Sequence, residues 1–368
     1  MFVRRIKGHD FDRCELIINP SRFPQYVKLL RKALKHTNFS KIVESRSREH
    51  FMECIRDFLD GEMPYLLVWG GDGTAHDTIN TMVKEASTET LGKKAVGFMR
   101  GGSGNGIQDS YEVPLFLKNQ LISYAESMRE DWVESVDLLY TEDEKGVEYG
   151  QLLGVGFDVR VLELRNRRVK ERGIFNGMPK PGLFNYISAT LKAFFGEPLE
   201  KEEFNIDLID GKYSYHGFRV NAEFPFTHLR RTTSIPMLEV GTRPYYGSLF
   251  KVCPDVVCND GTLDLYLYNL FDRPTIIRNV LLLWRGEHGR INKKLIKKGK
   301  PVIERYEITE CIISSERSFL YHIDGELREA PKRVSGEAYG VKVGVHPRAI
   351  RFLVPGTFYR KFHPDFSQ

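Results

Sequence analysis

The chain has 368 residues, of which 41% are hydrophobic and 28% are charged. This length exceeds what one ordinary core accommodates, so we expect two domains. The formal net charge of +5 is modest, and no apolar stretch reaches the 18 residues that a membrane-spanning helix needs. The composition therefore indicates a globular protein and excludes fibrous and membrane-spanning classes.

The N-terminal segment and the cysteines indicate the cellular compartment in which we expect the protein. The first seven residues, MFVRRIK, contain no apolar signal segment, which argues against secretion. Five scattered cysteines fit a reducing environment, and we interpret them as packing residues. The ten histidines show no metal-ligand spacing, so we interpret His288 and His322 as structural. We expect a cytoplasmic protein.

The first third of the chain alternates apolar strands with helical stretches. Strands are predicted at 14–18, 39–43, 65–69 and 95–99, and helices at 23–34 and 51–59. Strands separated by helices pair in parallel, because parallel neighbours need a long crossover. The sequence therefore predicts an α/β N-terminal domain with a Rossmann-like parallel sheet.

From about Glu148 the apolar residues follow a period of two, which is typical of antiparallel strands. Segments 204–209 and 212–224 flank Asp210-Gly211, which predicts a hairpin turn. Further strands are predicted at 262–268, 306–313, 319–323, 341–345 and 350–354, and helices at 183–195 and 275–298. We expect a larger antiparallel β domain.

Small or polar residues follow all four predicted parallel strands. They are Asn19-Pro20-Ser21, Glu44-Ser45-Arg46, Gly70 to Thr74, and Arg100 to Gly106. Because ligands bind beyond the carboxyl ends of parallel strands, these residues are expected to meet in one crevice.

The third loop, Gly70 to Thr74, has the chemistry of a phosphate site. Its glycines let the backbone approach phosphate oxygens closely, and Thr74 with Asp77 matches a capping box that would start a helix there. Asp72 fits such an anion site if it holds Mg²⁺ or accepts a hydroxyl proton. The alternative is an ordinary Gly-Asp-Gly turn.

The fourth loop repeats this composition. Its glycines between Gly102 and Gly106 loosen the backbone, and Ser103 and Asn105 could donate hydrogen bonds to phosphate. Arg100 could add a charged contact or lie on the surface. The alternative is a flexible glycine loop, and the sequence lacks the P-loop motif.

Acidic residues and basic runs mark the β domain. Asp158 follows a predicted strand, whereas Asn259-Asp260-Gly261 and Asp324-Gly325-Glu326 could be plain turns or functional sites. Basic residues gather between Arg165 and Arg172 and between Lys293 and Lys300. These runs fit a solvated face or adhesion to anionic lipid head groups, and no recognised motif supports nucleic-acid binding.

Taken in order, these motifs resemble the diacylglycerol kinase catalytic domain family, which includes bacterial diacylglycerol kinases and sphingosine kinases. The matching residues are Asn19-Pro20-Ser21, Gly70 to Thr74, Gly102 to Asn105, Gly156-Phe157-Asp158, Asn259 to Asp264, Asp324-Gly325-Glu326 and Val354-Pro355. The resemblance implies an ATP-binding α/β domain at 1–140, completed by 346–356, and a β-sandwich lipid-binding domain at 141–345. It also implies a nucleotide in the cleft between them.

Carried over by position, the resemblance assigns roles to single residues. ATP contacts would come from Asn19, Ser21, Ser45, Gly71, Asp72, Gly73, Thr74, Asp77, Ser103 and Asn105. A structural Mg²⁺ would be bound by Asp260 with the carbonyls of Val257 and Thr262. Asp324 or Glu326 would serve with Asp72 around the acceptor hydroxyl and a catalytic Mg²⁺, and Asp158 would lie near the lipid head group.

Three positions depart from the family pattern. Arg22 stands where glycine is usual, Arg100 where proline is usual, and Gly106 where bacterial diacylglycerol kinases have aspartate. The sequence thus resembles an ATP- and Mg²⁺-dependent kinase for diacylglycerol-like or sphingoid-like lipids. It is expected to bind anionic membranes peripherally, and a homodimer stays open. The alternatives are an NAD kinase, which shares the Gly70–Thr74 motif, and a lipid-binding regulator without activity.

Overall fold

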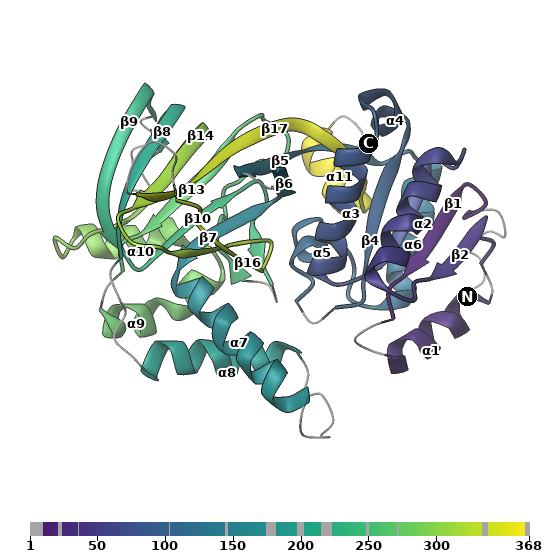
Figure 1. The fold of residues 1–368 in the computed structure, drawn as a ribbon, viewed down its shortest axis with the longest axis horizontal. Helices are drawn as coiled ribbons and strands as arrows, with labels where there is room; N and C mark the ends of the chain where they lie inside the picture. Colours follow the sequence, from purple (N-terminus) through teal and green to yellow (C-terminus); the bar gives the residue numbers. More distant parts are fainter. Residues whose placement is uncertain are drawn as a thin grey trace. The chain divides into compact units, whose positions relative to one another are not determined.

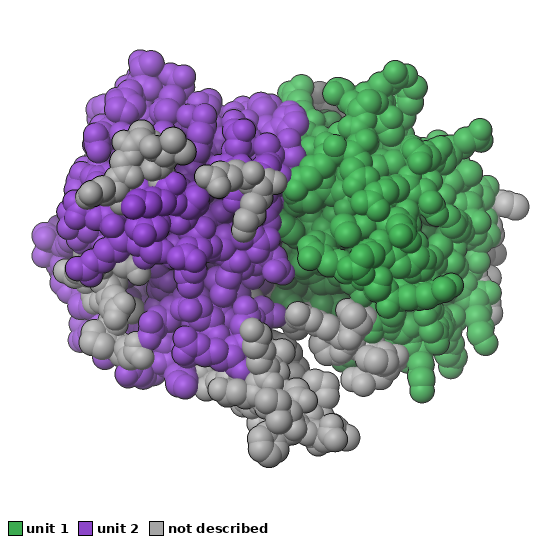
Figure 2. All heavy atoms as spheres, viewed as in Figure 1, with its two compact units in different colours: residues 1–136, 348–368 green, residues 137–347 purple. Residues whose placement is uncertain are grey.

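The computed structural model describes residues 10–20, 24–35, 37–102, 104–143, 146–173, 182–196, 202–214, 223–247, 250–270, 272–332 and 338–364. The chain divides into two compact units. Unit 1 comprises residues 1–136 and 348–368, and unit 2 comprises residues 137–347 (Figure 2).

Unit 1 is an α/β unit (Figure 1). Its elements are β1 (Cys14–Ile18), α1 (Pro24–Leu34), β2 (Lys41–Glu44), α2 (Arg48–Asp60), β3 (Tyr65–Gly70), α3 (Asp72–Glu85), α4 (Thr88–Lys93), β4 (Ala95–Arg100), α5 (Gly106–Ser110), α6 (Leu117–Arg129), the start of β5 (Val133–Asp143), the end of β17 (Tyr339–Leu353) and α11 (Gly356–Phe362). The strands pair in parallel in the order β2-β1-β3-β4-β17.

Burial explains why this sheet is parallel. Every residue of β1 and β3 is buried, which is typical of strands covered on both faces by helices. Helix α2 contributes an apolar face that includes Phe51, Ile55 and Phe58, and Ser47 caps its N-terminus by accepting the His50 N–H. The loops at the carboxyl ends of the strands are therefore set on a rigid core.

The last strand, β17, completes the sheet of unit 1. Phe352 pairs with Val96 of β4, and its buried ring packs edge-on against Phe98 and Tyr111, with centroids 5.3 and 4.9 Å apart. The chain thus returns to its first unit at its end.

Unit 2 is rich in antiparallel strands. Its further elements are β6 (Gly146–Gly150), β7 (Leu152–Gly156), α7 (Phe157–Gly173), α8 (Gly182–Gly196), β8 (Glu202–Ser214), β9 (Glu223–Ile235), β10 (Met237–Gly241), β11 (Tyr245–Tyr246), β12 (Phe250–Lys251), β13 (Leu263–Tyr268), α9 (Arg273–Trp284), α10 (His288–Ile296), β14 (Ile303–Ser315), β15 (Leu320–Ile323) and β16 (Glu326–Glu329). The central strand order is β16-β15-β7-β10-β13-β14-β17, with β8 paired to β14 and β9 paired to β8. The predicted fold class, an α/β region followed by a larger antiparallel region, is confirmed.

The hairpin predicted at Asp210-Gly211 is wrong. Strand β8 runs through both residues and keeps its register with β9 and β14 on either side of them. Asp210 has a positive φ of 43°, and a side chain at Gly211 would collide with the Glu307 carbonyl of β14. The glycine therefore permits close approach of a neighbouring strand.

Two predicted elements also differ in length. The single helix predicted at 275–298 is two helices, α9 and α10, because the chain reverses at Gly286, whose φ is +69°. Conversely, the strands predicted at 341–345 and 350–354 form one strand, β17. None of the described helices is long and apolar enough to cross a bilayer.

We predict that Phe352→Ala destabilises the protein by about 3–5 kcal/mol, because it leaves a cavity between Phe98 and Tyr111. The free energy of unfolding in urea measures this effect. Phe116→Ala is the matched control: its side chain is 73% exposed, so the change should stay within about 0.5 kcal/mol. Equal losses in the two variants would contradict the packing described here.

Candidate functional site

The loop after β3 leads directly into helix α3. Gly71 is the N-cap, and the helix begins at Asp72, two residues before Thr74. The predicted capping box of Thr74 and Asp77 is therefore wrong, because both residues lie inside the helix. Asp77 instead forms an ion pair with Arg48, whose Nη2 is 2.6 Å from Asp77 Oδ1.

The loops after β3 and β4 touch through their backbones. The Gly101 N–H donates to the Gly70 carbonyl at 2.9 Å. A Cβ placed on Gly71 would lie 2.9 Å from the Gly102 Cα, so neither loop has room for a side chain at this contact. Glycine at these positions therefore permits the close approach of the two loops.

Polar residues from neighbouring strand ends are joined by hydrogen bonds. Asn19, after β1, donates its side-chain amide to the Thr74 hydroxyl at 3.1 Å. Asp72 Oδ1 accepts the N–H of Ile107 in α5 at 3.1 Å. Ser45 is buried after β2, and its N–H donates to the Ile18 carbonyl at 2.9 Å. These residues lie at one edge of the sheet, whereas Ser21 and Ser103 lie outside the described residues.

Asn105 holds the fourth loop closed. It has a positive φ of 57° and precedes α5. Its side-chain oxygen accepts the Gly102 N–H at 3.0 Å, and its amide donates to the Gly102 carbonyl at 2.9 Å. Its side chain thus shapes the backbone that could face a phosphate.

Arg100 was expected either to contact phosphate or to lie on the surface, but it pairs with Asp109 instead. Its side chain is 12% exposed, with Nη2 2.5 Å from Asp109 Oδ1 and Nε donating to the Val113 carbonyl at 3.0 Å. The arginine therefore fixes the segment after β4. Gly106 is buried at the start of α5, and its carbonyl accepts the Ser110 hydroxyl.

The Asp324-Gly325-Glu326 turn separates its two carboxylates by environment. Asp324 is 8% exposed, and its carboxylate accepts the N–H groups of Gln151 and Leu152 and a hydrogen bond from Arg243 at 3.1 Å. It is therefore committed to holding the turn, where its own φ is +49°. Glu326 begins β16 and is exposed to solvent.

The Asp260 turn is closed by hydrogen bonds within the protein. Asp260 Oδ1 accepts the Thr262 N–H at 3.0 Å and its hydroxyl at 2.8 Å. The buried carboxylate of Asp137, in β5, accepts the Gly261 N–H at 2.6 Å. Val257 lies on the same loop and is 37% exposed. The sequence did not single out Asp137, because its partner is distant along the chain.

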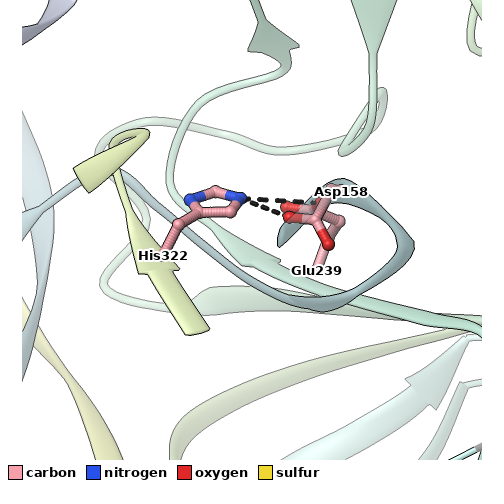
Figure 3. Close-up of side chains that lie close together, drawn as sticks. All are labelled: Asp158, Glu239 and His322. Atoms are coloured by element: carbon pink, nitrogen blue, oxygen red, sulfur yellow. Dashed lines mark ion pairs between the residues drawn. The ribbon is translucent and has the colours of Figure 1, made fainter. Parts of the chain in front are cut away.

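A buried cluster of Asp158, Glu239 and His322 lies over Gly154 (Figure 3). Gly154 of β7 pairs with Glu239 of β10 on one side and with His322 of β15 on the other. A Cβ on Gly154 would lie 2.6 Å from His322 Nε2 and 2.7 Å from Glu239 Oε1. The missing side chain therefore makes the space in which the two residues meet Asp158, from the first turn of α7.

Hydrogen bonding indicates the protonation of this cluster. His322 Nδ1 accepts the Gly325 N–H at 3.3 Å, so Nε2 carries the ring hydrogen and points at Asp158, which it contacts. Burial, and then the neighbouring Asp158, raises the pKa of Glu239 well above its ordinary value. Burial thus favours the protonated form of Glu239.

The same cluster has ligand types that bind metals. Its ligand atoms lie within 4.8 Å of one another. Metal binding at His322 Nε2 would require a hydrogen on Nδ1, which would then oppose the Gly325 N–H. We therefore interpret the cluster as a buried group of interacting side chains, in which His322 pairs with Asp158 and its Nδ1 accepts the N–H of Gly325 in the turn before Glu326. The structural role of His322 stays a prediction, and nothing in the sequence pattern pointed to Glu239.

Comparisons with known proteins agree with the fold and with the loops that follow β1 to β4. An α/β unit with glycine loops at its strand ends, followed by an antiparallel unit, defines the general class. Residues 14–141 match the model of the diacylglycerol kinase catalytic domain family. The resemblance predicted from the sequence is thus confirmed.

Individual relatives are distant. Diacylglycerol kinases of two Mycobacterium tuberculosis strains, CDC 1551 / Oshkosh and H37Rv, are each 23% identical over 239 residues. The match spans 64% of this chain and 65% of each relative's length. A solved diacylglycerol kinase structure from Bacillus anthracis strain Sterne superposes with a TM-score of 0.56 at 14% identity, covering 95% of this chain and 98% of that one. This structural likeness shows the shared fold.

We predict that Gly154→Ala destabilises the protein by about 1–3 kcal/mol, because its Cβ would enter the space that Glu239 and His322 occupy. Thermal unfolding measures the effect. Gly289→Ala is the control, since nothing lies within 4 Å of a Cβ there, and it should be neutral or stabilising by about 0.5–1 kcal/mol. A Gly154→Ala protein as stable as the control would refute this packing.

The raised pKa of Glu239 predicts a pH dependence of stability. Above pH 4.5, the ordinary pKa of this group, the unfolded chain loses the proton that the folded protein keeps, so unfolding becomes easier as pH rises. Glu239→Gln has no such proton to lose. Urea unfolding from about pH 5 to about pH 8 should therefore show the variant gaining stability relative to the unsubstituted protein.

The exposed Glu203 provides the control for this titration. Glu203→Gln makes the same carboxyl-to-amide exchange at an exposed position and controls for that exchange. A constant stability difference between Glu239→Gln and the unsubstituted protein at every pH would show that Glu239 does not hold its proton in the folded state.

Proposed function

We propose that this chain is an ATP-dependent lipid kinase, acting on the hydroxyl of a diacylglycerol-like or sphingoid-like lipid. The observation that carries the proposal is the backbone contact between Gly71 and Gly102 beside Asp72, within the segment that matches the kinase family model. The match to curated diacylglycerol kinases supports the same chemistry.

The first step is nucleotide binding by the loops of unit 1. Helix α3 has 14 residues and begins at this contact, so its first N–H groups and the positive end of its dipole favour a phosphate. Bulky side chains at Gly71 or Gly102 would fill the cradle, and their absence fits a phosphate group. Asn19 and Thr74 would donate hydrogen bonds beside it.

The second feature of the proposed nucleotide site is its negative charge at Asp72. Asp72 lies in the first turn of α3, and its Oδ1 is held by the Ile107 N–H, which fixes the direction of the carboxylate. A phosphate site tolerates such an acid where it faces a cation or a hydroxyl proton. We propose this role for Asp72.

The carboxylate and carbonyl oxygens of these loops are suitable ligands for magnesium. Asp260, with the carbonyls of Val257 and Thr262, would offer hard oxygen ligands to a structural Mg²⁺ from one loop of unit 2. Asp72 would separately offer a carboxylate to a catalytic Mg²⁺. When bound beside phosphates, Mg²⁺ neutralises their developing charge. Asp137 would keep the Asp260 loop in shape by holding the Gly261 N–H.

The acceptor hydroxyl needs a group that takes its proton. We propose Glu326, because its carboxylate is exposed whereas that of Asp324 is committed to Arg243 and two main-chain N–H groups. Asp158, predicted near the lipid head group, is buried against His322, so its role there stays a prediction. A lipid substrate would bring the protein to a membrane surface.

Asp72→Asn tests the nucleotide site. The amide can still accept the Ile107 N–H but cannot bind a cation as a carboxylate does, so transfer of phosphate to lipid should fall by roughly 100-fold or more. Asp57→Asn, at an exposed position of α2, should retain full activity. Full lipid kinase activity in a folded Asp72→Asn protein would end the proposal.

Glu326→Gln and Asp324→Asn separate the two carboxylates. If Glu326 accepts the proton, its variant should lose roughly 100-fold or more in kcat with an unchanged Tm. Asp324→Asn should instead lower the Tm, because Arg243 would lose its buried partner. The opposite pattern would reassign the base to Asp324.

A further inference from the structure

Helix α9 turns an apolar face to solvent. Ile277, Val280, Leu281 and Trp284 are 51%, 49%, 68% and 40% exposed, and they follow the spacing of one helix face. Thr275, Asn279 and Leu283 are buried on the opposite face, against unit 2. The helix is therefore amphipathic in the reverse sense: its packed face includes polar residues, and its solvent face is apolar.

Basic residues concentrate around this face. Residues 273–300, which include α9 and α10, contain nine basic residues against one acidic residue, a net charge of +8. The whole chain carries only +5, so the rest of it is net negative at −3. Arg278 and Arg285 are exposed beside the apolar stripe, and Lys297 and Lys298 are exposed after α10. The segment 273–300 therefore carries more net positive charge than the chain as a whole.

Helix α8 also has exposed apolar side chains. Leu191 and Phe195 are 52% and 59% exposed, one helical turn apart. The Arg273 guanidinium lies 5.9 Å from the centroid of the neighbouring Phe194 ring, which places the end of α8 against the start of α9 (Figure 1). The exposed apolar residues of α8 therefore lie on a helix whose end neighbours the start of α9.

We propose that α9 is a membrane-docking helix that inserts its apolar stripe into an anionic lipid surface. Apolar side chains with a tryptophan would enter the boundary between head groups and acyl chains, and the flanking arginines and lysines would contact anionic head groups. The proposal extends the proposed function, which expects a lipid substrate, by naming the surface that reaches the membrane.

Charge decides between a membrane and a second copy of this chain. An apolar stripe alone could fit either. Pairing two copies through α9 would bring two segments of net charge +8 together, which is repulsive. An anionic bilayer complements both the apolar stripe and the positive flanks.

Flotation with lipid vesicles tests the proposal without ATP or substrate. The protein should float with vesicles of phosphatidylcholine and phosphatidylserine, and less with phosphatidylcholine alone. The double variant Leu281→Glu/Trp284→Glu should reduce binding by roughly tenfold or more, because it removes the inserting groups and adds negative charge. Its matched control is Leu115→Glu/Phe116→Glu, at positions 67% and 73% exposed in unit 1, which should bind as the unsubstituted protein does.

Charge is tested in the same assay. Arg278→Glu should weaken binding roughly fivefold or more, and added salt should weaken it further, whereas Arg317→Glu, an exposed position outside this segment, should have a smaller effect. Unchanged binding in the α9 variants, or an equal loss in the controls, would overturn the proposal. So would a concentration-dependent dimer that the α9 variants abolish.

The flotation assay and the kinase assay test the membrane-docking proposal and the proposed function separately. Loss of flotation with retained transfer to detergent-dispersed lipid is the expected behaviour of the α9 variants. Normal flotation without any kinase activity would refute the proposed function alone.

Discussion

The contact between the backbones of Gly71 and Gly102 is the constraint on which the proposed nucleotide site depends. It brings the loops after β3 and β4 so close that neither could carry a side chain there. The hydrogen bond from the Ile107 N–H to Asp72 then ties the start of α3 to α5. Main-chain donors, a helix N-terminus and a carboxylate are thereby fixed on one rigid sheet edge before any ligand arrives.

Buried polar pairs decide which charged groups remain available for chemistry. Arg100 is committed to Asp109, and Asp324 to Arg243, so these charges hold loops in shape. Such groups are costly to bury alone and are stable only with their partners. In unit 2, Glu326, which is exposed, follows the turn that Asp324 holds in shape.

Much of the fold could be predicted from local patterns. The apolar runs of β1, β3 and β4 and the polar residues after them are visible in sequence, because buried parallel strands are continuous apolar segments. Features that depend on which strands pair, and in which register, could not be predicted. Asp210-Gly211 has turn composition but lies within a strand, and Glu239 acquires its role only through its register with Gly154. Arg100 likewise could not be assigned, because its partner depends on the path of the chain after β4.

The most direct measurement is the destination of phosphate from ATP. The purified protein would be incubated with γ-³²P-labelled ATP, Mg²⁺, a total lipid extract and NAD, and the products separated into organic and aqueous phases. The account predicts label in an organic-phase product that mass spectrometry identifies as a phosphorylated lipid alcohol. Label in NADP, or no labelled product in either phase, would contradict it.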